Sequence, residues 1–335
     1  MTAQNQKPDM LRLSGKIKYI ILFVLATQYQ FVPGQDIPVY NQYFSDYSLI
    51  CSALTGKDNC YAIGLTDQHQ WLGIEGAPNT QAVYGSGQFG SSDKGATSYH
   101  GLGLLIARDA NGPYSVMRIS GTYSFHVLIS EARKMHLAFA LIPSFSQSVL
   151  NQGDFLNYNN DPLITGEHLS VWNPNAEISA AVYNSYYFAG ASVMDIFPQI
   201  SYLSDPVEAD RNSRQYFIIG GYRFHNRQNN MTFEPSAVFR FNEHTSKQLD
   251  LNLKVYYKEI FWSGISYRYS LDAIPGSTIN ILPTIGVFIK NLELSYTFDL
   301  GFKGLQNRSL GSHYIYLGWR LCKENRGSIP CPVYK

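Results

Sequence analysis

Four cysteines are the residues of this chain with the clearest capacity for covalent chemistry. They lie in two equally spaced pairs near the two ends of the chain, at Cys51, Cys60, Cys322 and Cys331. In an exported protein, cysteines meet an oxidising compartment and form disulfides by default. Pairing within each end and pairing across the two ends remain open, because spacing does not fix connectivity. The spacing matches no usual zinc pattern, so a zinc site is disfavoured.

Serine and histidine are the next candidates, because a nucleophilic serine needs a histidine base within hydrogen-bond reach. Ser124 and His126 fall on one face of an expected strand, which would suit a barrel lipid hydrolase. Strict alternation places many such pairs on a common face, so this pair alone does not indicate catalysis. The eight histidines are scattered and include no short metal-binding pair. We therefore expect no catalytic residue, no metal and no cofactor.

Two further segments resemble ligand sites only as patterns of letters. Gly85 to Gly90 match the dinucleotide fingerprint Gly-x-Gly-x-x-Gly. The residues that follow read Ser-Ser-Asp-Lys-Gly and predict no helix, so a turn between two strands is favoured. The acidic and amide residues between 154 and 161 have no recognised calcium spacing and predict a solvated loop.

Strand-length segments with strict apolar and polar alternation must position all of these side chains. From Leu249 to Tyr257, apolar side chains on one face oppose Asp250, Asn252 and Lys254 on the other. Residues 292–300 and 314–321 repeat the pattern. A period of two separates an apolar face from a polar one. In a soluble sandwich the apolar face would pack a core, whereas in an outer-membrane barrel it faces lipid and the polar face lines the lumen.

Composition favours the barrel. Charged residues make up 15% of the 335 residues, against roughly 25% in soluble domains. The sequence has no run of about 20 apolar residues that would span a membrane as a helix. Aromatic residues gather at the ends of the expected strands, where interfacial girdles would place them. We predict an all-β fold, a transmembrane antiparallel β-barrel of about 14 strands of the outer-membrane type.

The first 34 residues have the layout of a secretory signal peptide. Basic residues precede a short apolar run and a small residue, in the order Arg12, Lys16, Lys18, 19–26 and Gly34. We predict cleavage after Gly34, so that N-terminal analysis of the mature protein finds Gln35 first. The true start is Met1 or Met10, and Met10 gives a signal of ordinary length. Cleavage removes four basic residues and one acidic residue, which changes the formal net charge from +1 to −2.

No domain boundary interrupts the rest of the sequence, which has no long charge run, proline-rich linker or low-complexity tract. We predict an N-terminal periplasmic segment over residues 35–59, a barrel over 60–322 and a C-terminal tail over 323–335. The mature chain has no basic face, so nucleic acid is not an expected partner.

One segment carries a family resemblance. Residues 70–81 read Gln-Trp-Leu-Gly-Ile-Glu-Gly-Ala-Pro-Asn-Thr-Gln. They strongly resemble a signature of the PorP/SprF family, the membrane proteins of the type IX secretion system and of gliding motility. The matching positions are Gln70, Trp71, Gly73, Gly76, Ala77, Pro78 and Thr80. Shorter matches follow in order through residues 35–321, and departures occur at 51–53, Gln68 and Tyr314.

The resemblance implies a non-enzymatic outer-membrane barrel in a protein-export machine, without a cofactor. The partners that it implies are the periplasmic lipoprotein ring, a peptidoglycan-binding component, the translocon, secreted cargo and outer-membrane lipid. Small residues and a proline at 76–78 fit a turn. The signature serves either as barrel architecture or as a partner-docking site. A passive porin, which requires an open polar-lined pore, is the alternative function.

Overall fold

The computed structural model describes most of the chain beyond the expected signal peptide. The described residues are 41–90, 97–154, 168–197, 214–226, 228–242, 247–258, 260–271, 279–301 and 309–322. The predicted signal peptide at 1–34, the predicted tail at 323–335 and Cys331 lie outside them. The helices that are described are short 3-10 turns: η1 Asn41–Phe44, η2 Tyr47–Leu49, η3 Ser52–Leu54 and η4 Gln152–Asp154. Within these residues, no helix is long and apolar enough to cross a membrane.

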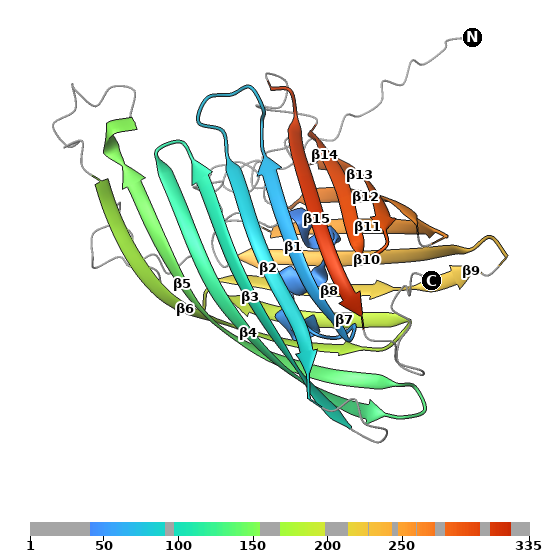
Figure 1. The fold of residues 1–335 in the computed structure, drawn as a ribbon. Helices are drawn as coiled ribbons and strands as arrows, with labels where there is room; N and C mark the ends of the chain where they lie inside the picture. The colour runs from blue at the N-terminus through green and yellow to red at the C-terminus, as the bar shows by residue number, and fades with distance from the viewer. Residues whose placement is uncertain are drawn as a thin grey trace, which may run out of the picture. The chain divides into compact units, whose positions relative to one another are not determined.

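Fifteen strand segments form one antiparallel sheet that closes into a barrel (Figure 1). They are β1 Cys60–His69, β2 Asn79–Phe89, β3 Ser98–Asn111, β4 Tyr114–Ser130, β5 Met135–Asn151, β6 His168–Tyr183, β7 Tyr187–Met194, β8 Gln215–Tyr222, β9 Phe224–Asn226, β10 Met231–Asn242, β11 Lys247–Tyr257, β12 Phe261–Ser270, β13 Ile279–Ile289, β14 Leu292–Gly301 and β15 Ser312–Cys322. β8 and β9 both pair with β10 and are separated only by Arg223. Counted as one strand, they give the 14-stranded barrel that the alternation predicts.

Each strand places its polar face inward and its apolar face outward. On β11, Leu251 and Leu253 are 48% and 40% exposed, whereas Asp250 and Asn252 are 2% and 5% exposed. This arrangement inverts that of a soluble sandwich, in which the apolar face is buried. An exposed apolar wall around the whole barrel is stable only against lipid.

Outward-facing aromatic side chains mark the two rims of this wall. Near the rim where β1 begins, the exposed rings are those of Tyr61, Tyr222, Phe224, Tyr257 and Phe261. Near the opposite rim they are those of Tyr114, Trp172, Tyr267, Tyr269 and Tyr296. Two such bands are typical of a barrel anchored at both membrane interfaces.

The two ends of the barrel differ in the length of their connections. We call the end where β1 begins and β15 finishes the terminus end, and the opposite end the loop end. Connections at the terminus end span two to eight residues, whereas 152–167 and 195–214 at the loop end span 16 and 20 residues. β1 and β15 pair over their full length, so the two chain termini of the barrel meet at one seam.

Candidate functional site

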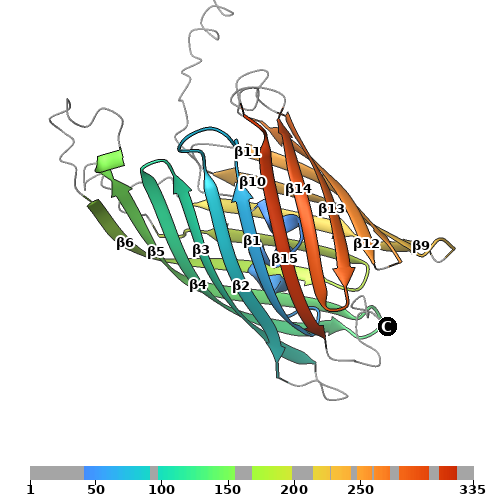
Figure 2. The ribbon, with the colours of Figure 1, turned by 45° about the horizontal axis from the view of Figure 1, so that its top comes forward.

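Residues 41–56, here the luminal segment, lie inside the barrel. Figures 1 and 2 show its three short helices between the front strands β15, β1 and β2 and the rear strands β7, β8 and β10. This position differs from the periplasmic one that the sequence predicts for residues 35–59. The segment is therefore the first candidate site, because it occupies the space that a transport path would need.

An apolar patch on the inner wall explains why the segment lies there. Tyr47, Ile50 and Leu54 of the segment are buried in one cluster with Ile142 of β5 and Phe217 of β8. Full burial of one such aliphatic side chain is worth about 1.5–3 kcal/mol. The patch lies on an inner face that also carries many polar side chains. Alternation within single strands does not reveal that the segment covers this patch.

Hydrogen bonds attach the segment to strands on several sides of the barrel. Tyr43 Oη donates to Asp250 Oδ2 on β11 at 2.6 Å, and Tyr47 Oη lies 2.7 Å from Ser236 Oγ on β10. Further contacts are Ser192 Oγ to the Ile50 carbonyl at 2.5 Å, the Ala53 amide to Ser179 Oγ at 2.7 Å and Tyr84 Oη to Asp46 Oδ2 at 3.1 Å. The polar inner wall thus satisfies backbone and side-chain groups of the segment, as buried polar groups require.

Ser124 and His126, the pair noted in the sequence, hold the last turn of the segment. Ser124 Oγ donates to the Thr55 carbonyl at 2.8 Å, and His126 Nε2 lies 2.9 Å from the same oxygen. A carbonyl only accepts, so Nε2 carries the proton, and Nδ1 accepts from Tyr183 Oη at 2.6 Å. Both side chains are fully buried. Ser124 Oγ and His126 Nε2 lie 3.0 Å apart. With its proton on Nε2, the imidazole turns an N–H rather than a lone pair toward the hydroxyl, and the two side chains together hold the Thr55 carbonyl. We call this arrangement the latch.

A buried lysine binds the aromatic side chains at the other end of the segment. Lys254 Nζ lies 4.8 Å and 4.6 Å from the ring centroids of Phe44 and Tyr47. Its counter-ion is Glu234, at 3.5 Å, and Glu234 also accepts from Arg223 Nε at 2.7 Å. Cation–π contacts strengthen when the cation is desolvated. The ion pair on the wall therefore helps to hold the aromatic side chains of the luminal segment in place.

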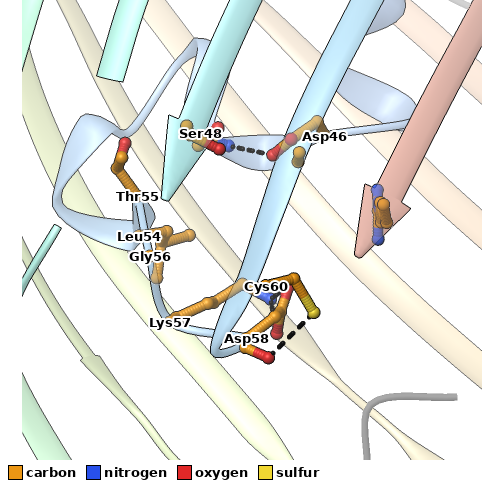
Figure 3. A pocket seen from close by; sticks show the side chains of 11 residues that line it. Asp46, Ser48, Leu54, Thr55, Gly56, Lys57, Asp58 and Cys60 are labelled. Carbon is orange, nitrogen blue, oxygen red and sulfur yellow. Dashed lines mark hydrogen bonds and ion pairs between the residues drawn. The ribbon is translucent and has the colours of Figure 1, made fainter. Parts of the chain in front are cut away.

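A small cavity of about 30 Å³ lies between the luminal segment and β1 (Figure 3). Asp46, Ser48 and Thr55 of the segment line it together with Lys57 and Arg320. A space of this size with several polar partners suits ordered water. The cavity is too small for a peptide or a sugar, and it explains how the charged groups at this point are solvated.

The cysteines occupy different environments. Cys60 and Cys322 form a disulfide that joins β1 to β15 across the seam, which is one of the pairings across the chain ends. Cys51 is a free thiol within the luminal segment and is fully buried. Burial raises the pKa of the Cys51 thiol, so the thiolate is disfavoured while the segment is in place. No three His, Cys, Asp or Glu residues in the described part of the chain converge as a metal site would require.

The second candidate site is the segment 70–80, which comprises the connection between β1 and β2 at the loop end and the first two residues of β2. Gln70 N donates to the Pro78 carbonyl at 2.9 Å, and Ala77 N donates to the carbonyl of Ile74 at 3.3 Å. Gly73 and Gly76 have φ values of 93° and 71°, a left-handed conformation that glycine adopts without a Cβ penalty. The glycines of the segment are therefore explained by the path of the backbone.

Backbone hydrogen bonds tie this connection to its two neighbours. Leu72 N donates to the Gly311 carbonyl and Leu310 N donates to the Leu72 carbonyl, each at 2.8 Å. On the other side, Gly112 N donates to the Gly76 carbonyl at 2.9 Å. Residues 70–78, 112–113 and 309–311, which belong to the connections β1–β2, β3–β4 and β14–β15, thus form one linked surface at the loop end, which we call the linked loops.

The side chains of the segment 70–80 and its neighbour Leu310 do not line a binding pocket. Trp71 is half-buried, and its backbone amide donates to Ser312 Oγ at 3.1 Å. Thr80 is buried, and its hydroxyl donates to Asp109 Oδ1 at 2.5 Å. Leu72 is 42% exposed and Leu310 is 71% exposed. The linked loops present a backbone platform with two exposed leucines, and no catalytic geometry is found among the described residues there.

A closed antiparallel barrel with a lipid-facing apolar wall, two aromatic bands and a lumen that holds its own N-terminal segment is a protein of the outer-membrane β-barrel class. The family model of the type IX secretion system membrane protein PorP/SprF matches residues 32–319. The chain belongs to this family, and it is a component of that secretion system located in the outer membrane. The resemblance seen in residues 70–81 is thereby confirmed.

Solved structures with a similar fold include other outer-membrane proteins. CdiB from Acinetobacter baumannii has 8% identity and a TM-score of 0.41, over 78% of this chain and 60% of CdiB. The outer membrane protein Omp33 from Acinetobacter baumannii has 10% identity and a TM-score of 0.43, over 79% of this chain and 100% of Omp33. A mutant of the Rh. blastica porin has 10% identity and a TM-score of 0.36, over 78% of this chain and 99% of the porin. No curated protein matches the chain.

Proposed function

We propose that this protein acts by binding other proteins of the type IX secretion machinery and secreted cargo, without catalysis and without an open pore. The observation that carries the proposal is the luminal segment, which lies in the lumen and is hydrogen-bonded to the wall at Asp250, Ser236, Ser192 and Ser179. A filled lumen leaves the two ends as the working surfaces. The latch at Ser124 and His126 supports the absence of a serine nucleophile.

The connection lengths support an orientation of the barrel in the membrane. Outer-membrane barrels have short periplasmic turns and longer external loops. By this rule the terminus end faces the periplasm, where the lipoprotein ring and the peptidoglycan-binding component would contact it. The linked loops, with the signature residues Trp71, Gly76 and Pro78, face outward and would contact cargo or the translocon.

In-cell crosslinking separates this proposal from a passive porin. Photo-crosslinkers at Leu72 or Leu310, both exposed at the loop end, are expected to capture cargo or translocon protein. Crosslinkers at Ala132 or Asn291, exposed in terminus-end turns, are expected to capture the periplasmic ring. Recovery of neither group, together with a steady single-channel conductance of the purified barrel, would favour the porin.

Gly101→Ala is expected to displace the luminal segment. A β-carbon at Gly101 would overlap the Thr55 carbonyl and the Ser124 hydroxyl, so the latch cannot form. We expect a stability loss of about 1–3 kcal/mol and the appearance of ion conductance in planar bilayers. Gly121→Ala, on the neighbouring strand β4, is the matched control, because nothing lies within 4 Å of its added β-carbon. Equal behaviour of the two variants would contradict the plugging role.

Gly190→Cys is expected to lock the segment in place through the natural Cys51. A β-carbon at Gly190 would lie 2.7 Å from Cys51 Sγ, close to the roughly 3 Å between a β-carbon and the partner sulfur in a disulfide. Mass spectrometry of the unreduced variant should find the 51–190 peptide pair. Ala191→Cys, which faces outward on the same strand, should leave Cys51 free.

The locked barrel also tests the conductance of the first variant. The Gly101→Ala, Gly190→Cys double variant should conduct less than Gly101→Ala alone, and reduction should remove the difference. If the double variant conducts as much as Gly101→Ala alone, ions pass by a route other than the one that the segment fills.

A further inference from the structure

Three turns at the terminus end hold a lysine in a strained backbone conformation. Lys134, Lys258 and Lys290 have φ values of 47°, 51° and 56°. Residues with a β-carbon rarely adopt this left-handed region, and glycine or asparagine usually occupies it. The other left-handed residues without a glycine at this end are Asn59 and Asn230, with φ values of 53° and 49°. Lysine is retained at positions where the backbone favours another residue, which points to a use for its charge.

The charge of the connections supports such a use. In residues 57–59 before β1 and in the described turns at the terminus end, the basic residues are Lys57, Arg133, Lys134, Lys258 and Lys290 and the acidic ones are Asp58 and Glu131. In the described connections at the loop end, the acidic residues are Glu75, Asp154 and Asp195 and the basic one is Arg214. In the described turn 131–134, Arg133 is exposed next to Lys134. Among the described residues, the terminus end is therefore the more basic of the two ends, and the three strained lysines lie there.

Two of the lysines border the lipid-facing wall, and Lys134 is exposed in its turn. Tyr257 precedes Lys258, and Ile289 precedes Lys290; these two side chains face outward and are 43% and 60% exposed. Lys258 Nζ lies 5.1 Å from the centroid of the Tyr257 ring, so its ammonium group follows the outer wall. The turns lie on separate parts of the ring, after β4, β11 and β13. A collar at the edge of the aromatic band lies at the depth of lipid headgroups.

We propose that Lys134, Lys258 and Lys290 form a collar that binds the phosphates of anionic lipid headgroups in the leaflet at the terminus end. A basic side chain near an anionic leaflet gains electrostatic free energy, and this gain offsets the cost of the left-handed backbone. The collar anchors the basic end of the barrel and does not depend on the proposed partners.

The test replaces all three lysines with asparagine, which removes the charge and keeps a residue that tolerates the turn. Urea unfolding of the full chain is measured in vesicles of phosphatidylcholine alone and in an equal mixture of phosphatidylcholine and phosphatidylglycerol. In the anionic vesicles, the unfolding equilibrium constant of the variant should rise relative to the native chain by about fivefold per lysine. In the neutral vesicles, the variant should be as stable as the native chain or more stable.

Lys247→Asn, at the loop end where β11 begins, is the matched control and should show no lipid dependence of this size. Salt should remove the difference between native chain and variant in the anionic vesicles, because exposed charges are screened. An effect of the triple variant that is equal in both vesicle types would overturn the proposal. Loss of crosslinks to an acidic periplasmic protein without any lipid dependence would also overturn it and would assign the lysines to a protein partner.

Discussion

Glu234→Gln is expected to destabilise the barrel by about 3–5 kcal/mol, the cost typical of removing one partner from a buried ion pair. Glu234 is 1% exposed and Lys254 is 3% exposed. Glu234 is within ion-pair distance of both Lys254 and Arg223. Without it, Lys254 remains buried beside the rings of Phe44 and Tyr47, and the next acid that acts on its charge is Glu293.

The effect of Glu234→Gln should reach the luminal segment. If Lys254 moves toward water, it leaves the two aromatic rings, so the segment loses contacts at the same time as the wall. The temperature at which the folded band is lost on gel electrophoresis should fall, and bilayer conductance should rise. Glu131→Gln, an exposed acid in a terminus-end turn, should change stability by less than about 0.5 kcal/mol.

A second substitution tests the reason for the loss. Adding Lys254→Met to Glu234→Gln removes the stranded cation and keeps an apolar side chain for the rings, so much of the lost stability should return. Arg223 remains, but its side chain is 37% exposed and can be solvated. If the double variant is less stable than Glu234→Gln alone, the electrostatic explanation is wrong and the lysine itself is the main contributor.

Loss of the Cys60–Cys322 disulfide is expected to lower the free energy of unfolding by a comparable amount, up to roughly 5 kcal/mol. Without the disulfide, the unfolded chain is less constrained and gains conformational entropy. The two cysteines are 262 residues apart in sequence, so the disulfide closes almost the whole barrel into one loop. It also fixes the register of β1 against β15 at the seam. Cys60→Ser combined with Cys322→Ser should therefore lower the urea midpoint of unfolding.

Reduction provides an independent measurement of the same effect. The native chain unfolded in a reducing agent should match the double serine variant, whose own midpoint should not respond to the agent. Cys51→Ala is the control, because Cys51 forms no disulfide among the described residues, and its midpoint should respond to reduction as the native one does. Identical midpoints for the oxidised and reduced native chain would refute the prediction.

The architecture of this protein could be predicted from local pattern because lipid imposes a simple rule on each strand. Leu251 faces outward and Asp250 faces the lumen because successive side chains of a strand point to opposite faces of the sheet. Alternation in the sequence is therefore enough to predict the side of the wall on which each residue lies. The family could be predicted because residues 70–81 form a dense set of backbone-determined positions. Gly73 and Gly76 occupy left-handed conformations, and such positions leave a strong trace in sequence.

The luminal segment could not be placed in the same way. Residues 49–54 form a short apolar stretch without alternation. Such a stretch is equally consistent with burial inside the barrel and with docking to a partner outside it. Its seat is built from Ile142, Phe217 and other side chains on separate strands. Ser124 and His126 were noted as a pair, but their common partner is the Thr55 carbonyl, a backbone group that no side-chain pattern records.

The sequence by itself determined the barrel, its strand number, its outer-membrane setting and its family, because each follows from periodicity or from a contiguous motif. Only the tertiary structure decided that the lumen is occupied, that Cys60 pairs with Cys322 and that three connections are linked at the loop end. These features join residues far apart in the sequence, and the disulfide alone joins two that are 262 positions apart. Their partners are chosen by closure of the sheet, which brings β15 beside β1, and closure is a property of the whole ring that no single strand encodes.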